Sequence, residues 1–189
     1  MQVKKDDIRS SILIMAERLF IRSGYENTSL KMIAGKCNIS KSNIYRYFSS
    51  KEEIYETIVG PARETIVSGS AVFFSEETIN KSFSDKCEEI PLVLSSLMSR
   101  FHSEILIMLR SEGGRDRKMI EDLITDSFVS SCPIGKSGAR ELISRMLIYG
   151  ITDILLKHSS EEDLLRELRS LIRYHYLGLK GLKEGESAL

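Results

Sequence analysis

Residues 28–48 read TSLKMIAGKCNISKSNIYRYF, and this stretch decides the fold of the chain. Its first half repeats apolar residues with the period of a helix, and Thr28 or Ser29 can cap the start of that helix. Asn38 tolerates the left-handed backbone conformation that a tight turn needs, and Ser40 can cap the short helix that follows. The stretch therefore predicts a helix-turn-helix. Its two helices would pack together through Ile33, Ala34, Cys37, Ile39, Ile44 and Phe48.

One helix is predicted before this stretch and another after it. Apolar residues recur at helical spacing between Ile8 and Phe20, and Gly24 can end that helix in the left-handed conformation. After the stretch, Ser50 and Glu53 form a capping box for a fourth helix. We therefore expect a three-helix head over residues 1–50, with the helix-turn-helix at about 28–48, and a larger helical domain over residues 51–189.

The rest of the chain predicts longer helices and no strands. Apolar periodicity places them near residues 51–73, 76–84, 88–110, 115–130, 138–157 and 161–179. Residues 130–138 form the clearest loop, and Ser159 with Glu162 gives the last helix a capping box. Gly60-Pro61 should kink or break the fourth helix, because proline lacks an N–H and clashes with the preceding turn. Alternatively, one helix ends near Val59 and another begins at Pro61. The predicted fold class is all-α.

Composition limits the class of protein. Hydrophobic residues make up 42% of the 189 residues, which is enough for a sizeable core. The net charge is zero, but residues 1–59 hold ten Lys and Arg against seven Asp and Glu, and the remainder holds seventeen against twenty. A mildly basic N-terminal part on a mildly acidic body suits a head that meets phosphate.

Metal, cofactor, catalytic and membrane signals are missing from the sequence. The cysteines Cys37, Cys87 and Cys132 form no CxxC pair, and the histidines His102, His158 and His175 lack metal-site spacing. Gly135-Lys136-Ser137 resembles the end of a phosphate loop, but the required first glycine is replaced by Ser130. The N-terminus is charged, and no apolar run is long enough to span a membrane. We expect a cytoplasmic protein with no metal, cofactor or membrane partner and no enzymatic activity.

The short helix that begins after Ser40 carries groups suited to DNA. Lys41, Ser42 and Asn43 occupy its N-terminal turn, which meets base edges when a helix enters the major groove. Hydroxyl and cationic groups on both flanks can meet phosphate oxygens. Tyr47 can equally pack on the first helix. The expected DNA-binding residues are Thr28, Ser29, Ser40, Lys41, Ser42, Asn43, Tyr45, Arg46, Tyr47 and Lys51.

Residues 8–58 strongly resemble the DNA-binding head of the tetracycline-repressor (TetR) family. The resemblance is carried by TSLKMIA at 28–34, ISKSNIYRYF at 39–48 and SKEE at 50–53. Cys37-Asn38 stands where the family usually has Ala-Gly, and Gly35 falls inside a predicted helix at a cost of about 1 kcal/mol. Cys is small and Asn accepts the turn, so these departures leave the resemblance intact.

The resemblance implies a helical regulatory domain that binds a ligand and dimerises through its last two helices. The sequence agrees, because both helices carry apolar residues on more than one face; the alternative is that both are central core helices. The expected interface is Leu142, Met146, Tyr149, Gly150, Leu164, Leu168, Leu171, Ile172 and His175. The candidate pocket residues, each of which could instead be plain core, are Met98, Phe101, His102, Ile105 and Met108.

These features predict a sequence-specific DNA-binding transcriptional regulator. It would be a homodimeric repressor that a small hydrophobic or amphipathic effector releases from a palindromic operator in duplex DNA. The first alternative is a DNA-binding protein of the same fold without a small-molecule effector. The second is a helical interaction module that has lost DNA binding.

Overall fold

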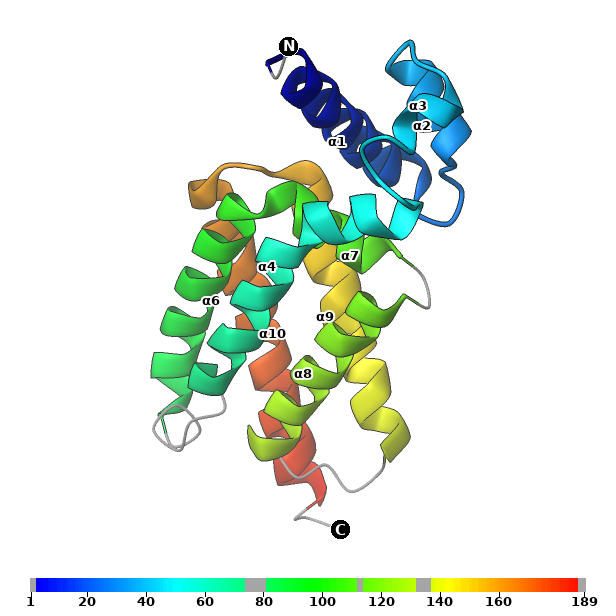
Figure 1. Cartoon of the computed structure of the whole chain (residues 1–189). Coiled ribbons are helices and arrows are strands. Elements are labelled where there is room, and N and C mark those ends of the chain that lie inside the picture. The colour runs from blue at the N-terminus through cyan, green and yellow to red at the C-terminus, as the bar shows by residue number, and fades with distance from the viewer. Residues whose placement is uncertain (1–2, 74–80, 112–113, 132–136, 187–189) are drawn as a thin grey trace.

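The computed structural model describes residues 3–73, 81–111, 114–131 and 137–186. Within these ranges the chain forms nine helices and no strand (Figure 1), so the predicted all-α fold is confirmed. The helices are α1 (Val3–Ser23), α2 (Leu30–Lys36), α3 (Lys41–Ile44), α4 (Lys51–Phe73), α6 (Phe83–Arg100), α7 (His102–Arg110), α8 (Arg115–Ser131), α9 (Ser137–Lys157) and α10 (Glu161–Glu186).

Helices α1, α2 and α3 form the head, and their ends follow the local sequence signals. Gly24 ends α1 with a φ of 82°, and Asn38 makes the turn after α2 with a φ of 52°. The hydroxyl of Ser29 accepts from the Met32 N–H, so Ser29 caps α2. Ser40 caps α3 in the same way. The buried residues that join the three helices are Ile12, Ala16, Phe20, Ile33, Ala34, Ile44 and Phe48.

Helix α4 leaves the head and runs along the body as one continuous helix. Ser50 accepts from the Glu53 N–H at its start, as the predicted capping box requires, whereas the Glu53 carboxylate is bound by Ser49. Of the outcomes expected at Gly60-Pro61, a break and a helix end near Val59 are wrong, because α4 continues through Pro61 to Phe73, whereas the kink stays a prediction. Val59 and Ala62 are fully buried on either side of the proline, and this packing holds the helix together.

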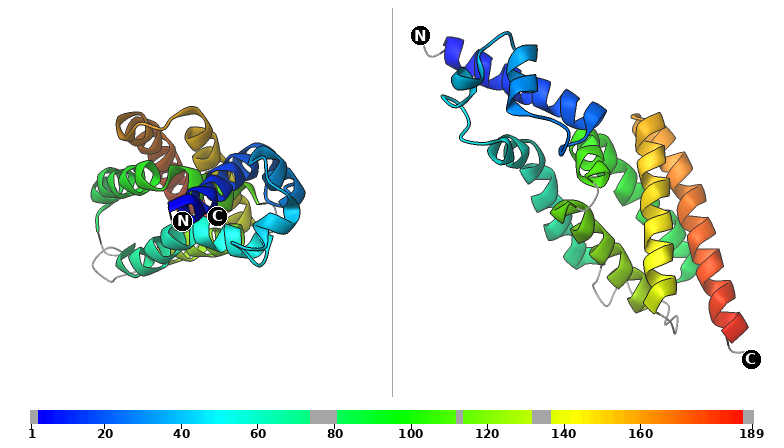
Figure 2. Two further views of the ribbon diagram at one scale, coloured as in Figure 1. Left: turned by 45° about the horizontal axis from the view of Figure 1, so that its top comes forward. Right: turned by 90° about the vertical axis from the view of Figure 1, so that its right-hand side faces the viewer.

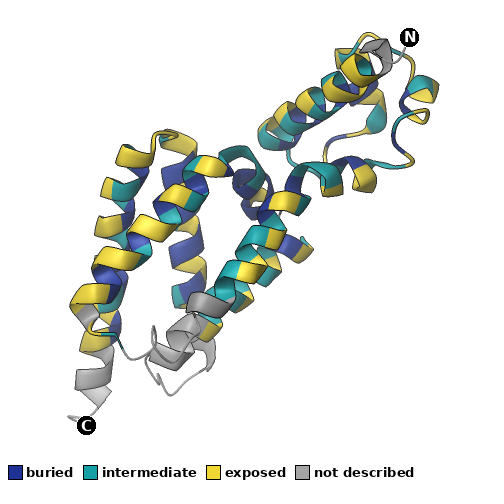
Figure 3. Ribbon diagram, turned by 60° about the vertical axis from the view of Figure 1, so that its left-hand side comes forward, coloured by how far each residue is buried: buried dark blue, intermediate teal, exposed yellow. Residues whose placement is uncertain are grey.

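The body surrounds α7, which lies between the head and the other body helices. Helix α7 contacts α1, α4, α8 and α9, and all five residues from Ile105 to Leu109 are therefore buried. Helices α6 and α10 pack along one another, and α9 packs against both α8 and α10 (Figures 1 and 2). Buried residues gather on the inward faces of these helices (Figure 3).

The expected helix over residues 88–110 is two helices instead. Helices α6 and α7 meet at Phe101 and are bent by 97° to one another. The bend lets α7 turn into the centre of the molecule, where its apolar run is covered on all sides, and Phe101 itself is buried. No single helix in the described ranges is long and apolar enough to cross a membrane; α6 and α7 meet that criterion only as this bent pair.

Some predicted boundaries also change. Ser160, rather than Ser159, caps α10 by accepting from the Asp163 N–H, and α10 extends beyond residue 179 to Glu186. Most of the helix expected at 76–84 lies outside the described residues, and residues 81–82 are not helical. Residues 132–136 of the expected loop, which include Cys132 and Gly135-Lys136, also lie outside them. The ends of that loop belong to α8 and α9.

Candidate nucleic-acid interface and body cavity

Helix α3 has one buried side and one exposed side. Ile44 is fully buried and, with Phe48, fixes α3 on the head. Lys41, Ser42 and Arg46 are exposed, and Tyr45 is about half exposed. The Lys41 ammonium lies 5.9 Å from the centre of the Tyr45 ring. The outer side of α3 and the turn after it thus present two cations and two hydroxyls, which are groups that can bond to phosphates and base edges.

Two cap residues extend this polar surface. Ser29 and Ser40 are both exposed, although each hydroxyl accepts a backbone N–H at a helix start. The hydroxyls of Ser40 and Ser42 lie 2.9 Å apart. An accepting hydroxyl still has a proton to donate, so these serines can reach a phosphate oxygen without giving up the cap.

Three expected DNA-binding residues face inward to different degrees. Thr28 is 2% exposed and donates its hydroxyl to the Gly24 carbonyl. Tyr47 is partly buried against the head core, as the packing alternative predicted. Asn43 Oδ1 is buried and has no hydrogen-bond partner among the described residues. To bond adenine through both amide atoms, Asn43 would therefore have to change rotamer.

Lys51 is bound inside the head. Its ammonium donates to the carbonyls of Tyr25 at 2.7 Å and Thr28 at 2.9 Å, and it lies 4.0 Å from the centre of the Tyr25 ring. Because an ammonium has three N–H donors, these two bonds leave one for a phosphate. Lys51 thus ties the start of α4 to the loop between α1 and α2, a role that sequence reasoning missed.

A buried polar cluster joins α4 to the start of α8. The Arg63 guanidinium binds both carboxylate oxygens of Asp116, at 2.6 and 2.7 Å, and the Tyr55 hydroxyl donates to the same carboxylate at 2.8 Å. Arg63 also binds Glu56. Burial by itself would raise the pKa of Asp116, but the bonds from Arg63 and Tyr55 outweigh it and hold that pKa below its ordinary value.

The head also meets the body directly. Ser111, at the end of α7, donates to the Glu26 carboxylate in the loop after α1 at 2.5 Å. The Tyr25 ring packs against Phe20 and Tyr55, and its hydroxyl donates to Glu52. Burial, followed by the bond to Glu52, raises the pKa of Tyr25. The head is therefore attached to the body through α4, the aromatic cluster and the Ser111–Glu26 bond.

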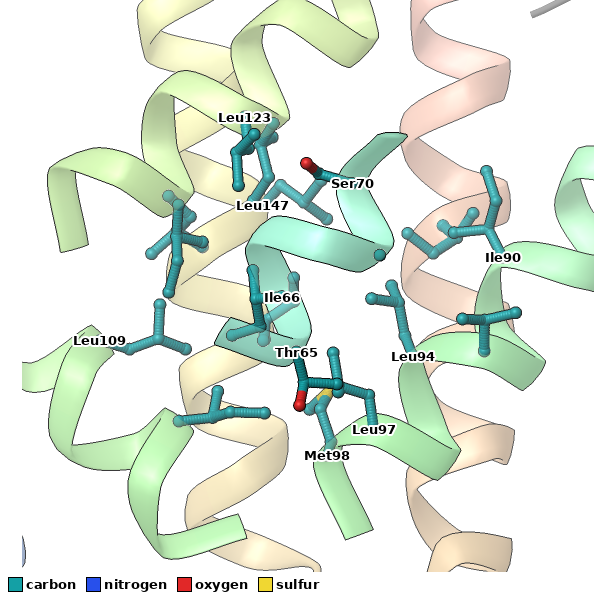
Figure 4. A pocket seen from close by; sticks show the side chains of 18 of the residues that line it. Thr65, Ile66, Ser70, Ile90, Leu94, Leu97, Met98, Leu109, Leu123 and Leu147 are labelled. Atoms are coloured by element: carbon teal, nitrogen blue, oxygen red, sulfur yellow. The ribbon is translucent and has the colours of Figure 1, made fainter. Parts of the chain in front are cut away.

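The body encloses a cavity of about 290 Å³ between six helices (Figure 4). Its lining comes from α4, α6, α7, α8, α9 and α10, and is almost entirely aliphatic. Thr65, Ser70 and Tyr176 bring the only polar side chains among the described lining residues. Thr65 donates to the Pro61 carbonyl and Ser70 to the Val67 carbonyl, so both hydroxyl protons are bound within α4.

Two of the five candidate pocket residues line this cavity, namely Met98 and Ile105. Phe101, His102 and Met108 do not. His102 Nε2 lies 2.8 Å from the Leu155 carbonyl oxygen and 3.1 Å from that of His158, so its N–H joins α7 to the end of α9. Sequence reasoning missed the contributions of α4, α8, α9 and α10, because no local pattern shows that these segments converge.

The expected interface residues on the last two helices fall into two groups. Leu142, Met146 and Tyr149 are about half exposed on α9. By contrast, four of the α10 residues are buried within the single chain and pack in its own core: Leu164, Leu168, Ile172 and His175.

Leu171 on α10 lies against Gly150 on α9, where an added Cβ would be only 2.8 Å from the leucine side chain. This pair therefore packs at the crossing of the two helices. Leu156, Tyr174 and Leu177 are exposed apolar residues that the sequence analysis did not select.

Comparison with known proteins connects this geometry to a family. Residues 12–58 match the sequence model described as bacterial regulatory proteins, tetR family. The transcriptional activator FasR of Mycolicibacterium smegmatis is 32% identical over 68 residues, which cover 36% of this chain and 31% of FasR. The negative transcriptional regulator IcaR of Staphylococcus aureus, which acts on the biofilm operon icaADBC, is 40% identical over 52 residues, 28% of each chain. The matches thus span less than a third of these curated relatives.

Similarity over nearly the whole chain comes from solved structures. A TetR-family transcriptional regulator from Bordetella parapertussis superposes with a TM-score of 0.62 at 18% identity, and the match covers 91% of this chain and 97% of that one. At this identity the match shows the fold alone. Residues 12–58 therefore carry the domain of the tetR family of bacterial regulatory proteins, and the chain as a whole has the fold of a TetR-family regulator.

Proposed function

We propose that the protein is a sequence-specific DNA-binding transcriptional regulator that acts as a homodimer on a palindromic operator. The observation that carries the proposal is the exposed surface of α3 and the turn after it, where Lys41 and Ser42 on the helix and Tyr45 and Arg46 in the turn are exposed, while Ile44 is buried in the head core. A short helix held in this way can enter the major groove with its N-terminal turn against the bases.

A second copy would complete the binding unit. Leu142, Met146 and Tyr149 recur at i, i+4 and i+7 on α9, and Tyr174 and Leu177 are exposed on α10. A two-fold interface through these helices would present two α3 helices to DNA, about 34 Å apart or at a multiple of that distance. The inverted repeat of the operator would match this symmetry.

We further propose that a small molecule in the cavity releases the protein from its operator. Helix α4 carries both the cavity residues Thr65 and Ile66 and, nearer the head, Tyr55 and Arg63, which bind Asp116 on α8. A ligand that shifts α4 would therefore move the head. A tenfold loss of operator affinity requires the ligand to bind the DNA-free arrangement of α4 and the head more tightly than the DNA-bound arrangement, by about 1.4 kcal/mol.

The experiment that tests the DNA-binding proposal is selection of bound duplexes from a random library by the full chain. We expect an inverted repeat whose affinity falls steeply with salt, because phosphate contacts release counterions. Lys41→Ala should change the ranking of operator variants. Selection of no sequence, or binding that is indifferent to salt, would contradict the proposal and favour a helical interaction module.

A further inference from the structure

The lining of the body cavity restricts the charge of a ligand. None of the described residues that line it carries a charge, although they come from six different helices. A carboxylate or ammonium group brought inside would lose its water without gaining an ion pair, which is strongly unfavourable. The cavity therefore selects for neutral, aliphatic compounds. At about 290 Å³ it lies just below the usual range for ligand pockets, about 300–1,000 Å³.

The two hydroxyls on α4 restrict the polar group of the ligand further. Thr65 and Ser70 each donate to a carbonyl of their own helix, at 2.8 and 2.7 Å. A hydroxyl has one proton and two lone pairs, so with these bonds in place both side chains offer a ligand an acceptor. A neutral O–H donor can bond to them, whereas a carboxylate or ketone oxygen would face lone pairs. Figure 4 shows both oxygens against the aliphatic lining.

The α6 side of the cavity includes a residue that is exposed to solvent. Val93 lines the cavity and is 50% exposed, and Ile90 and Leu94 on the same helix are partly buried along it. Helix α6 packs closely along α10, but α4 and α6 are not among the helix pairs that pack closely.

We propose that the effector is a neutral aliphatic alcohol, or a compound of that chemistry, held in the body cavity with its O–H donated to Thr65 or Ser70. This inference rests on the proposed function only for the consequence of binding, which is release of operator DNA. The preference for a neutral compound follows from the uncharged lining, and the preference for an O–H donor follows from the two hydroxyls on α4.

Gly69 provides a way to block the cavity without disturbing its walls. It lines the cavity, and a Cβ added there meets no atom within 4 Å. Gly69→Leu therefore fills the space where a ligand would lie. Gly60→Leu is the matched control, because Gly60 is on the same helix with equally open space and does not line the cavity.

The test is calorimetric titration of the full chain with 1-octanol, octanoate and octylammonium, which share one alkyl chain. We expect the dissociation constant of octanol to be at least tenfold lower than those of both ions. Gly69→Leu should raise that constant at least tenfold, and Gly60→Leu should leave it unchanged. Octanoate or octylammonium bound as tightly as octanol, or octanol binding unaffected by Gly69→Leu, would overturn the inference.

A second variant keeps the test decisive if Gly69→Leu does not fold. The double variant Thr65→Val with Ser70→Ala removes both acceptors on α4, so it should weaken octanol several-fold; an unchanged affinity would contradict the assigned bond. Operator binding by the wild-type chain is measured separately, without any alcohol. An operator-binding chain that does not bind octanol refutes only this inference, whereas a chain that binds no operator refutes the proposed function whatever the alcohol does.

Discussion

The head and the body cavity are built in opposite ways. In the head, residues close in sequence determine where the helices begin and end: Ser29 caps α2, Asn38 makes the next turn and Ser40 caps α3, all within twelve residues. The cavity instead depends on residues between Thr65 and Tyr176, which meet only when six helices pack. The head presents polar groups on its surface, whereas the body surrounds an apolar space. The head can therefore be recognised from local signals, whereas the body site exists only in the assembled fold.

The largest expected effect separates two kinds of apolar residue on the last two helices. Leu168 is fully buried in the single chain, so Leu168→Asp places an unpaired charge in the core and should destabilise the chain by more than about 4 kcal/mol. Met146 is about half exposed on α9, so Met146→Asp should leave the fold intact. It should weaken self-association by about 2 kcal/mol, or roughly thirty-fold.

Urea unfolding and sedimentation measure these two effects independently. The distinction between the core residue Leu168 and the exposed residue Met146 would fail if Leu168→Asp gave a folded monomer, because Leu168 would then belong to an interface rather than to the core. A wild-type chain that stays monomeric at micromolar concentration would remove the dimer from the proposed function.

The next effect tests the junction between the two regions. Asp116→Asn removes the buried carboxylate that the partly buried Arg63 guanidinium and the Tyr55 hydroxyl share, and should cost about 3 kcal/mol of folding free energy. The control is Asp122→Asn, whose partner Lys118 is exposed, and it should cost less than about 0.5 kcal/mol. Both values come from urea unfolding at neutral pH.

Acid titration sharpens the same comparison. The pKa of Asp116 is lower in the folded chain than in the unfolded one, so the ionised carboxylate stabilises the fold fully above its ordinary pKa of about 3.9. That contribution should disappear as the pH falls from there through the folded pKa. Asp116→Asn should lack this part of the acid destabilisation; an unchanged pH profile would contradict the role given to the carboxylate.

A third effect distinguishes two lysines of the head. Lys51 donates to two backbone carbonyls, so Lys51→Met should destabilise the head by about 2 kcal/mol and weaken binding to all DNA sequences about equally. Lys41 is exposed on α3, so Lys41→Met should leave stability within about 0.5 kcal/mol and change the preference among operator variants. Thermal unfolding and binding to an operator panel separate the two. Equal losses of stability would show that Lys41 is also structural.

The sequence predicts the head well because its signals act over a few residues. The caps Ser29 and Ser40 and the turn at Asn38 each depend only on neighbours in the chain. In the body, most helices could also be predicted from apolar period. The bend at Phe101 could not, since an uninterrupted apolar stretch is compatible with one long helix or with a turn into the core.

Burial in the body was harder to predict than helix position. An apolar stripe on α10 can pack against α6 of the same chain or against a second copy, and sequence period does not distinguish the two. Leu164 and Leu168 therefore belong to the core, although their pattern equally suits an interface. His102 similarly lies beside an apolar run, but it bonds to carbonyls at the end of α9 rather than facing the cavity.

The smallest expected effect tests whether the head really depends on single local conformations. Asn38 has a φ of 52°, where a Cβ is disfavoured and asparagine is better tolerated than most residues. Asn38→Ala should therefore cost about 1 kcal/mol, while Asn38→Gly should be neutral or slightly stabilising because glycine adopts this conformation without steric strain.

The control is Gly35→Ala in α2, where an added Cβ meets nothing within 4 Å; it should stabilise the head by up to about 1 kcal/mol through helix propensity. Thermal unfolding of the full-length variants gives the three values. If Asn38→Ala and Asn38→Gly unfolded at the same temperature, the turn between α2 and α3 would not require the left-handed conformation. The structure of the head would then not depend on local signals at this turn, where such a signal is most specific.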